Sequence, residues 1–370
     1  MMKLREDLFY IFKGIGVLHK MTPYNLLAKI MRSFCDAALP FCNLYFSSLI
    51  VNSLISKNPL KTVCLYIAIT VVANALLTIC SKYLDNINYI KWNGFYLRYN
   101  YSLGEKLMAL EYSRVEDPKT HIAIKQIEDA MKIGNYGLIK IHSRIPILFQ
   151  HLFELIFSIV LVANVIFTKG QLNISLLTDF SNSIYADISL VILMVIIAAV
   201  TICSNNKIAS EQYKLLGNLS QINRTSDFYL NQYLDGHKAG KDIRLYRQHK
   251  LINDEFRSFF KKSQVVVNKI TNISVNYNLL MQISTLFLVL YAYSYVSLKA
   301  MSGAFLVGSI LKYTGAILSF SGAFSGMADA FSQLCANTEY LKKYFSFAEL
   351  PEEQSTGNLP IPGTKNHTIE

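Results

Sequence analysis

The sequence predicts an all-α membrane protein whose six transmembrane helices continue into long cytoplasmic extensions. Of its 370 residues, 52% are hydrophobic and only 16% are charged. Soluble globular chains carry about a quarter charged residues, so this deficit indicates lipid as the surrounding solvent. Apolar segments of about twenty residues, the length that crosses the hydrocarbon core as a helix, recur along the chain. The gaps between these segments are unequal and basic, which is the third observation.

The first predicted element is an amphipathic helix over residues 1–22 that lies in the membrane interface. Its apolar face is formed by Leu4, Leu8, Ile11, Phe12 and Ile15. The segment lacks a small-residue cleavage site, so it is not predicted to be a signal peptide. A six-helix transmembrane domain over residues 23–347 follows. Its spans are predicted at 34–54, 62–82, 146–166, 187–204, 276–296 and 303–323.

The distribution of Lys and Arg predicts the topology. Twelve lie in 205–270 and seven in 83–137, inside the two long gaps. The three short connections (near 56–59, over 167–186 and near Lys299) together hold four, which are Lys57, Lys61, Lys169 and Lys299. Because basic residues stay on the cytoplasmic side, we expect a multi-pass cell-membrane protein with both termini cytoplasmic. The net charge of +11 is then mostly a topology signal, and no nucleic-acid partner is predicted.

The two long gaps are predicted to be helical. Both carry apolar residues at helical spacing, and at 1.5 Å per residue about 25 residues extend a helix by about 38 Å. Each gap is therefore expected to hold two helical extensions that meet at a turn. Proline cannot continue a helix and glycine weakens one, so the turns are placed at Glu116, Asp117 and Pro118, and near Asp235 and Gly236.

Three strings resemble the membrane domain of ABC exporters. EYSRVEDPKTH (111–121) is similar to the segment before the first coupling helix of that family, with Val115 where an aromatic residue is usual. RTSDFYLNQYLDGHKAGKDIRLY (224–246) is similar to the second coupling helix and the start of the helix that leads to span five. YLKKYFSFAELPEE (340–353) resembles the end of span six and the following linker. The resemblance implies coupling regions that contain Glu116, Asp117, Pro118, Tyr229, Tyr233, Leu234, Asp235 and Gly236.

The resemblance further implies the transmembrane domain of an ATP-driven exporter. Such a half-transporter pairs with a second one, as a homo- or heterodimer, to form a pathway for an amphipathic peptide, lipid or drug-like substrate. Residues 348–370 would be the linker to a nucleotide-binding domain absent from this chain. ATP and Mg²⁺ would bind on that domain, in the same or a separate chain, so the complete protein would be an ATP-hydrolysing translocase. This chain alone is not expected to be an enzyme, since its nearest phosphate-loop string, Gly236 to Lys241, is one residue short and is followed by Asp242.

Ionisable residues within the spans are candidates for a substrate cavity, because at membrane depth such groups usually face protein or water. Lys312, nine residues into span six and close to the midplane, shares a polar stripe with Ser309 and Tyr313. It is predicted either to line the cavity, where it would meet an anionic part of the substrate, or to form a buried pair or extend its ammonium to an interface.

Three further sets of ionisable residues are predicted to be mainly structural. His151 and Glu154 share a face of span three, as a ligand or proton site or, with greater weight, as a mutually satisfied pair. Arg32 and Asp36 are expected to form a structural pair, and Asp329 to lie on a solvated cavity wall below the membrane.

Two other functions are alternatives to export. A membrane sensor or scaffold that acts with an ATPase without transport fits the same pattern. A secondary carrier would require inverted repeats, broken helices and short cytoplasmic loops, whereas this chain has long ones. The histidines and cysteines show no metal-ligand spacing, and no catalytic constellation is visible.

Overall fold

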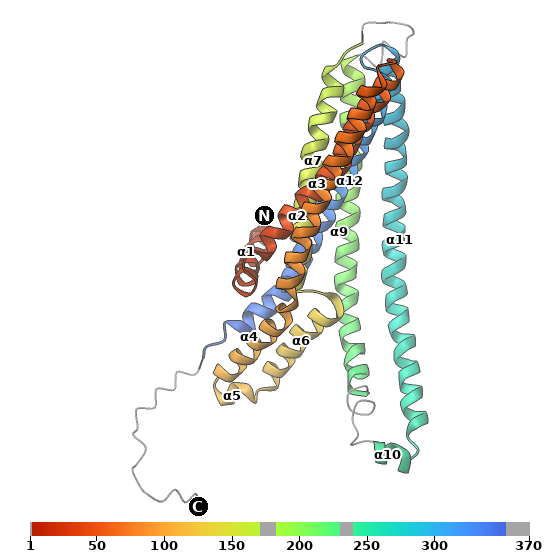
Figure 1. The fold of residues 1–370 in the computed structure, drawn as a ribbon. Helices are drawn as coiled ribbons and strands as arrows, with labels where there is room; N and C mark the ends of the chain where they lie inside the picture. Colours follow the sequence, from red (N-terminus) through yellow and green to blue (C-terminus); the bar gives the residue numbers. More distant parts are fainter. Residues whose placement is uncertain (1, 171–182, 230–239, 353–370) are drawn as a thin grey trace, which may run out of the picture.

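The computed structural model describes residues 2–170, 183–229 and 240–352, and every regular element in these ranges is an α-helix. The long helices run side by side along one direction (Figure 1). The helices are α1 (Met2–Met21), α2 (Asn25–Ile55), α3 (Leu60–Asn93), α4 (Phe95–Ala109), α5 (Tyr112–Val115), α6 (Pro118–Gly134), α7 (Leu138–Phe167), α9 (Ile184–Tyr229), α10 (Gly240–Leu245), α11 (His249–Met301) and α12 (Ser309–Ala348). We call the end with the α2–α3 turn the hairpin end and the opposite end the α10 end.

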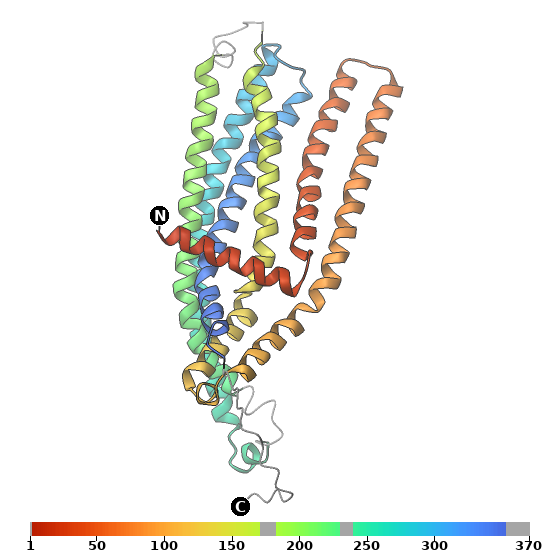
Figure 2. The ribbon, with the colours of Figure 1, turned by 90° about the vertical axis from the view of Figure 1, so that its left-hand side faces the viewer.

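Within the residues that the structure describes, five helical segments are long and apolar enough to cross a membrane. They are α2, α3 continued by α4, α7, the first part of α9 (Ile184–Gln212) and α11. The first five predicted spans lie within them. The sixth predicted span lies in α12, which runs alongside the others but is not among these five segments (Figures 1 and 2).

The lower hydropathy of α12 has a packing cause. The helix is rich in Gly, Ala and Ser, and two of its three glycines, Gly315 and Gly326, lie very close to neighbouring helices. A Cβ added at Gly315 would lie 2.5 Å from Leu44 of α2, and one at Gly326 would lie 2.1 Å from His151 of α7. Small residues at helix contacts allow helices to pack closely in membranes. In α12 they occupy positions where larger apolar residues would raise the hydropathy.

The N-terminal segment forms the predicted helix, α1, which crosses the long helices (Figure 2). Ile11 and Leu18 are buried in a cluster shared with α7 and α12, whereas Leu4 and Phe12 are 47% and 68% exposed. The buried Asp7 carboxylate accepts a hydrogen bond from Thr338 of α12 at 2.7 Å. The predicted apolar face is therefore divided, with one edge packed on the bundle and the other left uncovered.

The prediction that the long gaps form unbroken helical extensions is wrong in three places. α3 ends before Gly94, and α7 begins after Asn135 and Gly137, which have φ values of 50° and 71°. Arg247, with φ 51°, lies between α10 and α11. Positive φ cannot continue a right-handed helix, which explains two of the breaks. By contrast, α9 and α11 run for 46 and 53 residues without interruption.

The connection between the last two long helices is shifted from its predicted place. Lys299 was placed in this connection, but it lies in the last turn of α11, and the connection occupies 302–308. α12 begins at Ser309 rather than at residue 303.

Two hydrophobic clusters hold the helices together. The α10-end cluster joins α1, α4, α6, α7 and α12 through residues such as Leu18, Phe95 and Leu341. The hairpin-end cluster joins α7, α9, α11 and α12 through residues such as Val165 and Leu288. Neither cluster contains a buried residue of α2 or α3, but the partly buried Leu26 and Ile30 of α2 and Trp92 of α3 pack against the α10-end cluster.

Candidate functional site

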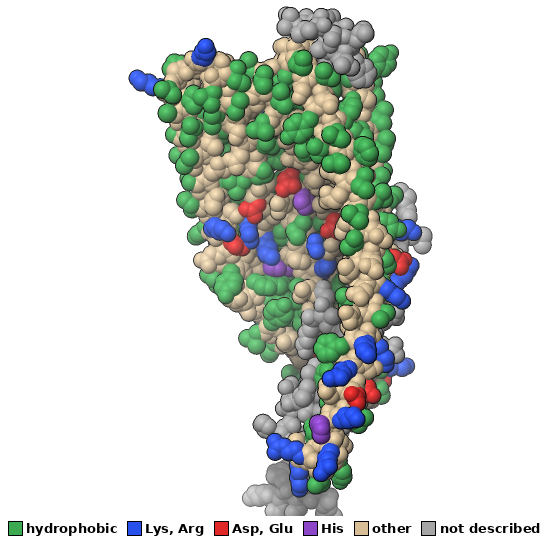
Figure 3. Space-filling view, turned by 90° about the vertical axis from the view of Figure 1, so that its right-hand side faces the viewer, with side chains coloured by type: hydrophobic (Ala, Val, Ile, Leu, Met, Phe, Trp, Pro, Cys, Tyr) green, Lys and Arg blue, Asp and Glu red, His purple; other side chains and the backbone are tan. Residues whose placement is uncertain are grey.

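Charged and histidine side chains gather across the middle of one face of the molecule, below an upper half that is mostly apolar (Figure 3). We use the name polar belt for seven residues on four helices. They are Arg32 and Asp36 of α2, Asp85 of α3, Arg144, His151 and Glu154 of α7, and Asp329 of α12. Each belongs to an ion pair, and the side chains are between 17% and 42% exposed.

The α2–α3 part of the belt is centred on Arg32. Its Nε lies 3.3 Å from the Asp36 carboxylate, which confirms the predicted contact between these two residues. Arg32 also forms an ion pair with Asp85 of α3, and Asp36 accepts a hydrogen bond from Ser81 at 2.6 Å. The guanidinium is thus held between two carboxylates and connects the two helices of the hairpin.

The α7–α12 part of the belt contains the other two ion pairs. Arg144 lies 3.4 Å from the Asp329 carboxylate, which also accepts from Gln333 at 2.9 Å. The structure brings His151 and Glu154 together, with Nδ1 and Oε2 2.8 Å apart, and Gln150 donates to the same carboxylate at 3.0 Å. Because the His151 ring lies against Gly326, this pair is at a close helix contact, as expected of a mutually satisfied pair.

The predicted stripe of Ser309, Lys312 and Tyr313 does not form one shared face. The Ser309 hydroxyl contacts Asn52 and Ser48 of α2 at 3.0 and 3.4 Å. Tyr313 is only 6% exposed and makes an edge contact with Phe305 in the hairpin-end cluster.

Lys312 lies in the first turn of α12, so the prediction that it lies nine residues inside a helix is wrong. Its ammonium lies 4.4 Å from the Tyr313 ring centroid and 5.7 Å from that of Tyr45. In the part of the chain that the structure describes, it forms no ion pair with Glu154 or any other carboxylate.

The first predicted coupling region is the turn between α5 and α6, which lies on the same side of the polar belt as α10. Asp117 caps α6 by accepting from the Lys119 amide at 2.9 Å, and Pro118 is the first helical residue. Glu116 accepts from the Tyr112 hydroxyl at 2.6 Å, and this hydrogen bond raises the pKa of Tyr112. Capping by aspartate and a first-turn proline together explain why α6 begins here.

The second predicted coupling region lies largely outside the described residues. Tyr229 is the last residue of α9, and Tyr233, Leu234, Asp235 and Gly236 fall in the range that is not described. The string GKDIRLY does form a helix in part, as α10, at the far end of the molecule from the α2–α3 turn (Figure 1).

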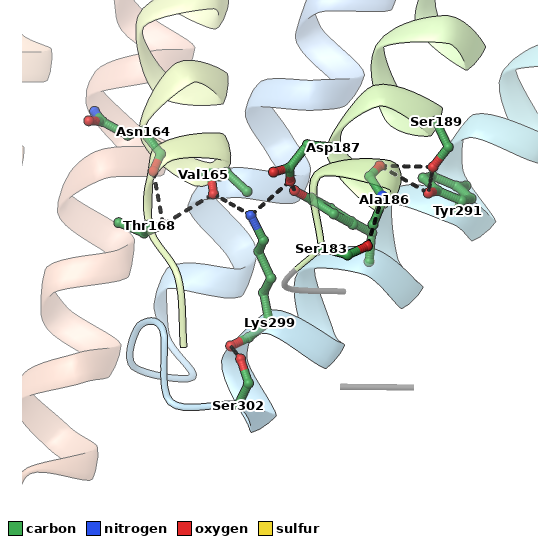
Figure 4. Close-up of polar contacts among 11 residues, drawn as sticks. Asn164, Val165, Thr168, Ser183, Ala186, Asp187, Ser189, Tyr291, Lys299 and Ser302 are labelled. Atoms are coloured by element: carbon green, nitrogen blue, oxygen red, sulfur yellow. Dashed lines mark hydrogen bonds and ion pairs between the residues drawn. The ribbon is translucent and has the colours of Figure 1, made fainter. Parts of the chain in front are cut away.

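A buried cluster at the hairpin end was not predicted from the sequence. Lys299 is fully buried, and its ammonium lies 3.0 Å from Asp187 Oδ1 and donates to the Val165 carbonyl at 2.8 Å. The Tyr295 hydroxyl donates to the same carboxylate (Figure 4). The Lys299 side chain of α11 thus contacts α7 through Val165 and α9 through Asp187. The sequence signal that could have revealed this cluster is an acid, Asp187, at the start of one apolar segment and a lysine, Lys299, at the end of the next.

Among the residues with described positions, no group of three or more His, Cys, Asp or Glu could hold a metal ion. No catalytic residue was predicted, and the polar belt contains no nucleophile paired with a base.

Comparison with known proteins gives one distant relative. No protein-family model matches the chain. Over 372 aligned positions the chain is 20% identical to the subtilin transport ATP-binding protein SpaT of Bacillus subtilis. The alignment covers 96% of this chain and 55% of SpaT, so the chain spans about half the length of that relative. Distant similarity to an ATP-binding transport protein, together with five apolar helices, fits a role in transport by a multi-pass membrane protein that works with an ATPase.

Proposed function

We propose that the chain is the transmembrane domain of an ATP-driven exporter of the ABC type, one half of a transporter that pairs with a second copy or a relative. The lengths of α9 and α11 carry the proposal. With 46 and 53 residues, they are about 69 and 80 Å long, more than twice the roughly 30 Å of a hydrocarbon core. A bundle that only crossed a membrane would not need such helices.

The charge along these helices supports the same function. On α9, Lys207 and Lys214 follow the apolar stretch, and Lys250, Arg257, Lys261 and Lys262 lie in the half of α11 nearest α10. Under the positive-inside rule this charge supports a cytoplasmic α10 end, and the proposed topology then has both termini on the same side. A nucleotide-binding domain with ATP and Mg²⁺, in the same or a separate chain, would dock against α10 and the turn at Asp117.

Long helices that end in short ones can transmit movement. A short helix seated on an ATPase domain would move with it, and the continuous α9 and α11 would carry that movement through the membrane. With α12 as the sixth span, the half-exposed polar belt would face the pathway and meet the polar part of an amphipathic substrate. The similarity to a protein named for subtilin transport supports a transported substrate.

The test uses the complete protein in proteoliposomes. ATP-dependent accumulation of fluorescent amphipathic peptides and lipids is measured together with ATP hydrolysis. Leu234→Pro, in the second coupling region, is expected to abolish accumulation while hydrolysis continues, because the ATPase domain loses its contact with α9 and α11. Leu60→Pro is the matched control, since Leu60 is exposed and is the first residue of α3, where proline is tolerated.

Two results would contradict the proposal. Unchanged accumulation by Leu234→Pro would remove the coupling role from this region. ATP hydrolysis by the unaltered protein without accumulation of any probe would favour the sensor or scaffold function instead.

A further inference from the structure

A cavity of about 430 Å³ lies among α2, α3, α4 and α7, next to the Arg32–Asp85 ion pair. Its lining is polar and aromatic, in contrast with the apolar grooves elsewhere on the bundle. Its lining includes Lys29, Asn88, Trp92, Tyr96 and His142, together with the paired Arg32 and Asp85. The cavity is close to the junction of α1 and α2, because Lys29 is the fifth residue of α2.

Lys29 supplies a cation without an acidic partner. Its ammonium lies 3.1 Å from His142 Nδ1 and 3.4 Å from the His142 carbonyl oxygen, but no carboxylate of the described residues is within ion-pair distance. An ammonium can only donate, so Nδ1 accepts and the imidazole proton lies on Nε2, 3.3 Å from Asn25 Nδ2. This tautomer requires the Asn25 amide to turn its oxygen toward Nε2, which also gives the otherwise unpartnered Asn25 Oδ1 a donor. His142 is therefore neutral. The charged side chains that act on the Lys29 ammonium are Arg32 and Asp85, whose effects oppose one another, and Asp85 is paired with Arg32 rather than with Lys29. Arg32, by contrast, is already held by Asp36 and Asp85.

Asn88 supplies an unused hydrogen-bonding side chain. It lines the cavity, is 3% exposed, and neither its Nδ2 nor its Oδ1 has a partner within the described part of the chain. A buried polar group without a partner costs about 1–3 kcal/mol, so such groups usually meet a ligand or water. The cavity thus combines an unpaired ammonium with an unpaired amide.

The rim of the cavity is suited to a membrane surface. Trp92, the one tryptophan of the chain, is stacked between His142 and Phe95 with ring centroids 3.5 and 4.2 Å away. Tyr96 is 44% exposed at the same rim. Tryptophan and tyrosine are enriched where headgroups meet the hydrocarbon. Nearby apolar side chains on α2 and α3, including Leu27, Met31 and Ile90, are more than half exposed and could lie along acyl chains.

We propose that this cavity binds the phosphate headgroup of an anionic phospholipid, with Lys29 as its counter-ion and the Asn88 amide as a hydrogen-bond donor to a phosphate oxygen. Basic pockets between transmembrane helices on the cytoplasmic side are suited to such headgroups. Binding there would fix the position of the α1–α2 junction relative to α3 and α7. The inference rests on the proposed topology, in which the α10 end is cytoplasmic, but it does not depend on transport.

Trp92 lines the cavity and is the single tryptophan of the sequence. The tryptophan fluorescence of the chain therefore reports whether the cavity is occupied. The full chain is reconstituted in phosphatidylcholine nanodiscs with increasing brominated phosphatidylglycerol or, in parallel, brominated phosphatidylcholine. We expect stronger quenching by the brominated anionic lipid. Lys29→Gln should weaken its apparent affinity about fivefold, the effect of one basic residue near a membrane surface. Lys61→Gln, at an exposed lysine near the hairpin turn, should leave it unchanged.

Equal quenching by the two lipids, or an unchanged affinity in Lys29→Gln, would overturn the proposal. Asn88→Leu, which fills the same space without an amide, should also weaken quenching and provides a second variant if Lys29→Gln does not fold. Inorganic phosphate at millimolar concentration should not displace the lipid; if it prevents quenching, the ligand is a soluble phosphate and the lipid assignment is wrong. Quenching requires no ATP hydrolysis, so the result is separate from the test of transport.

Discussion

The two ends of the bundle use ion pairs in different ways. At the hairpin end, Lys299 is fully buried and Asp187 is 11% exposed, and the pair is completed by a tyrosine hydroxyl and a main-chain carbonyl. In the polar belt, the side chains of Arg32, Asp85 and Asp329 are 33%, 42% and 42% exposed. The hairpin-end pair has all its hydrogen-bonding partners inside an apolar cluster. The ion pairs of the polar belt are partly exposed and connect neighbouring helices.

This difference indicates which part of the molecule can move. Opening the Lys299–Asp187 pair would leave a charge without water in an apolar region, which costs several kcal/mol per ion. Opening a belt pair exchanges it for water at little cost, as for surface ion pairs. We therefore expect α7, α9 and α11 to stay joined at the hairpin end while the helices separate and close across the belt.

The largest expected effect comes from Lys299→Met. This change leaves the Asp187 carboxylate buried without its ammonium partner, and we expect a loss of about 3–5 kcal/mol of unfolding free energy. Thermal unfolding of the detergent-solubilised protein, followed by circular dichroism, measures the loss. Adding Asp187→Leu to Lys299→Met should recover much of it, because no charge is then left buried. A loss below about 1 kcal/mol for the single variant would mean that the pair behaves like an exposed one.

The next effect tests the close contact of α12 with the belt. Gly326→Ala would place a Cβ 2.1 Å from His151 Nε2, so the imidazole must move away from its contact with Glu154. Overpacking of this kind costs about 1–3 kcal/mol. Gly322→Ala, one turn earlier on the same helix, is the control, since nothing lies within 4 Å of its added Cβ. Equal unfolding temperatures for the two variants would contradict the close packing of α7 on α12.

A smaller effect is expected inside the belt. The coupling between Arg144 and Asp329 can be measured with Arg144→Gln, Asp329→Asn and the double variant. Since both side chains are partly exposed and 3.4 Å apart, we expect a coupling energy of about 1 kcal/mol or less. A coupling as large as that of a buried pair would show that the belt is a second fixed junction, and the contrast with the hairpin end would disappear.

Much of the fold could be predicted from the sequence because apolar length and basic gaps are local signals. They located α2, α3, α7, α9 and α11, and the Asp117–Pro118 turn where α6 begins. The breaks at Asn135 and Arg247 depend on positive φ at residues that are not glycine, which periodicity does not reveal. A sixth span was predicted at 303–323, but α12 is not among the five segments apolar enough to cross a membrane, because its small residues serve helix contacts.

The candidate site was predicted less well, because it depends on which helices are neighbours. His151 and Glu154 share one helix, so their contact followed from spacing alone. Lys299 and Asp187 are on different helices and meet only after folding, so nothing local marked them as partners. Ser309 and Tyr313 were grouped by helical position, but Ser309 contacts α2, whereas Tyr313 packs in the hairpin-end cluster.

The smallest expected effect comes from Lys312→Met, the same substitution as at Lys299 but at a lysine with no carboxylate partner in the described part of the chain. Lys312 is half-exposed in the first turn of α12, where its ammonium contacts the faces of Tyr313 and Tyr45. Cation–π contacts at exposed sites contribute about 0.5–1 kcal/mol, and methionine keeps the apolar stem, so the unfolding free energy should fall by no more than that. A change in substrate-stimulated ATP hydrolysis by the complete protein, with basal hydrolysis unaltered, would assign Lys312 to the substrate pathway. Destabilisation as large as that of Lys299→Met would show instead that Lys312 has a buried anionic partner, and the contrast between the two lysines would be wrong.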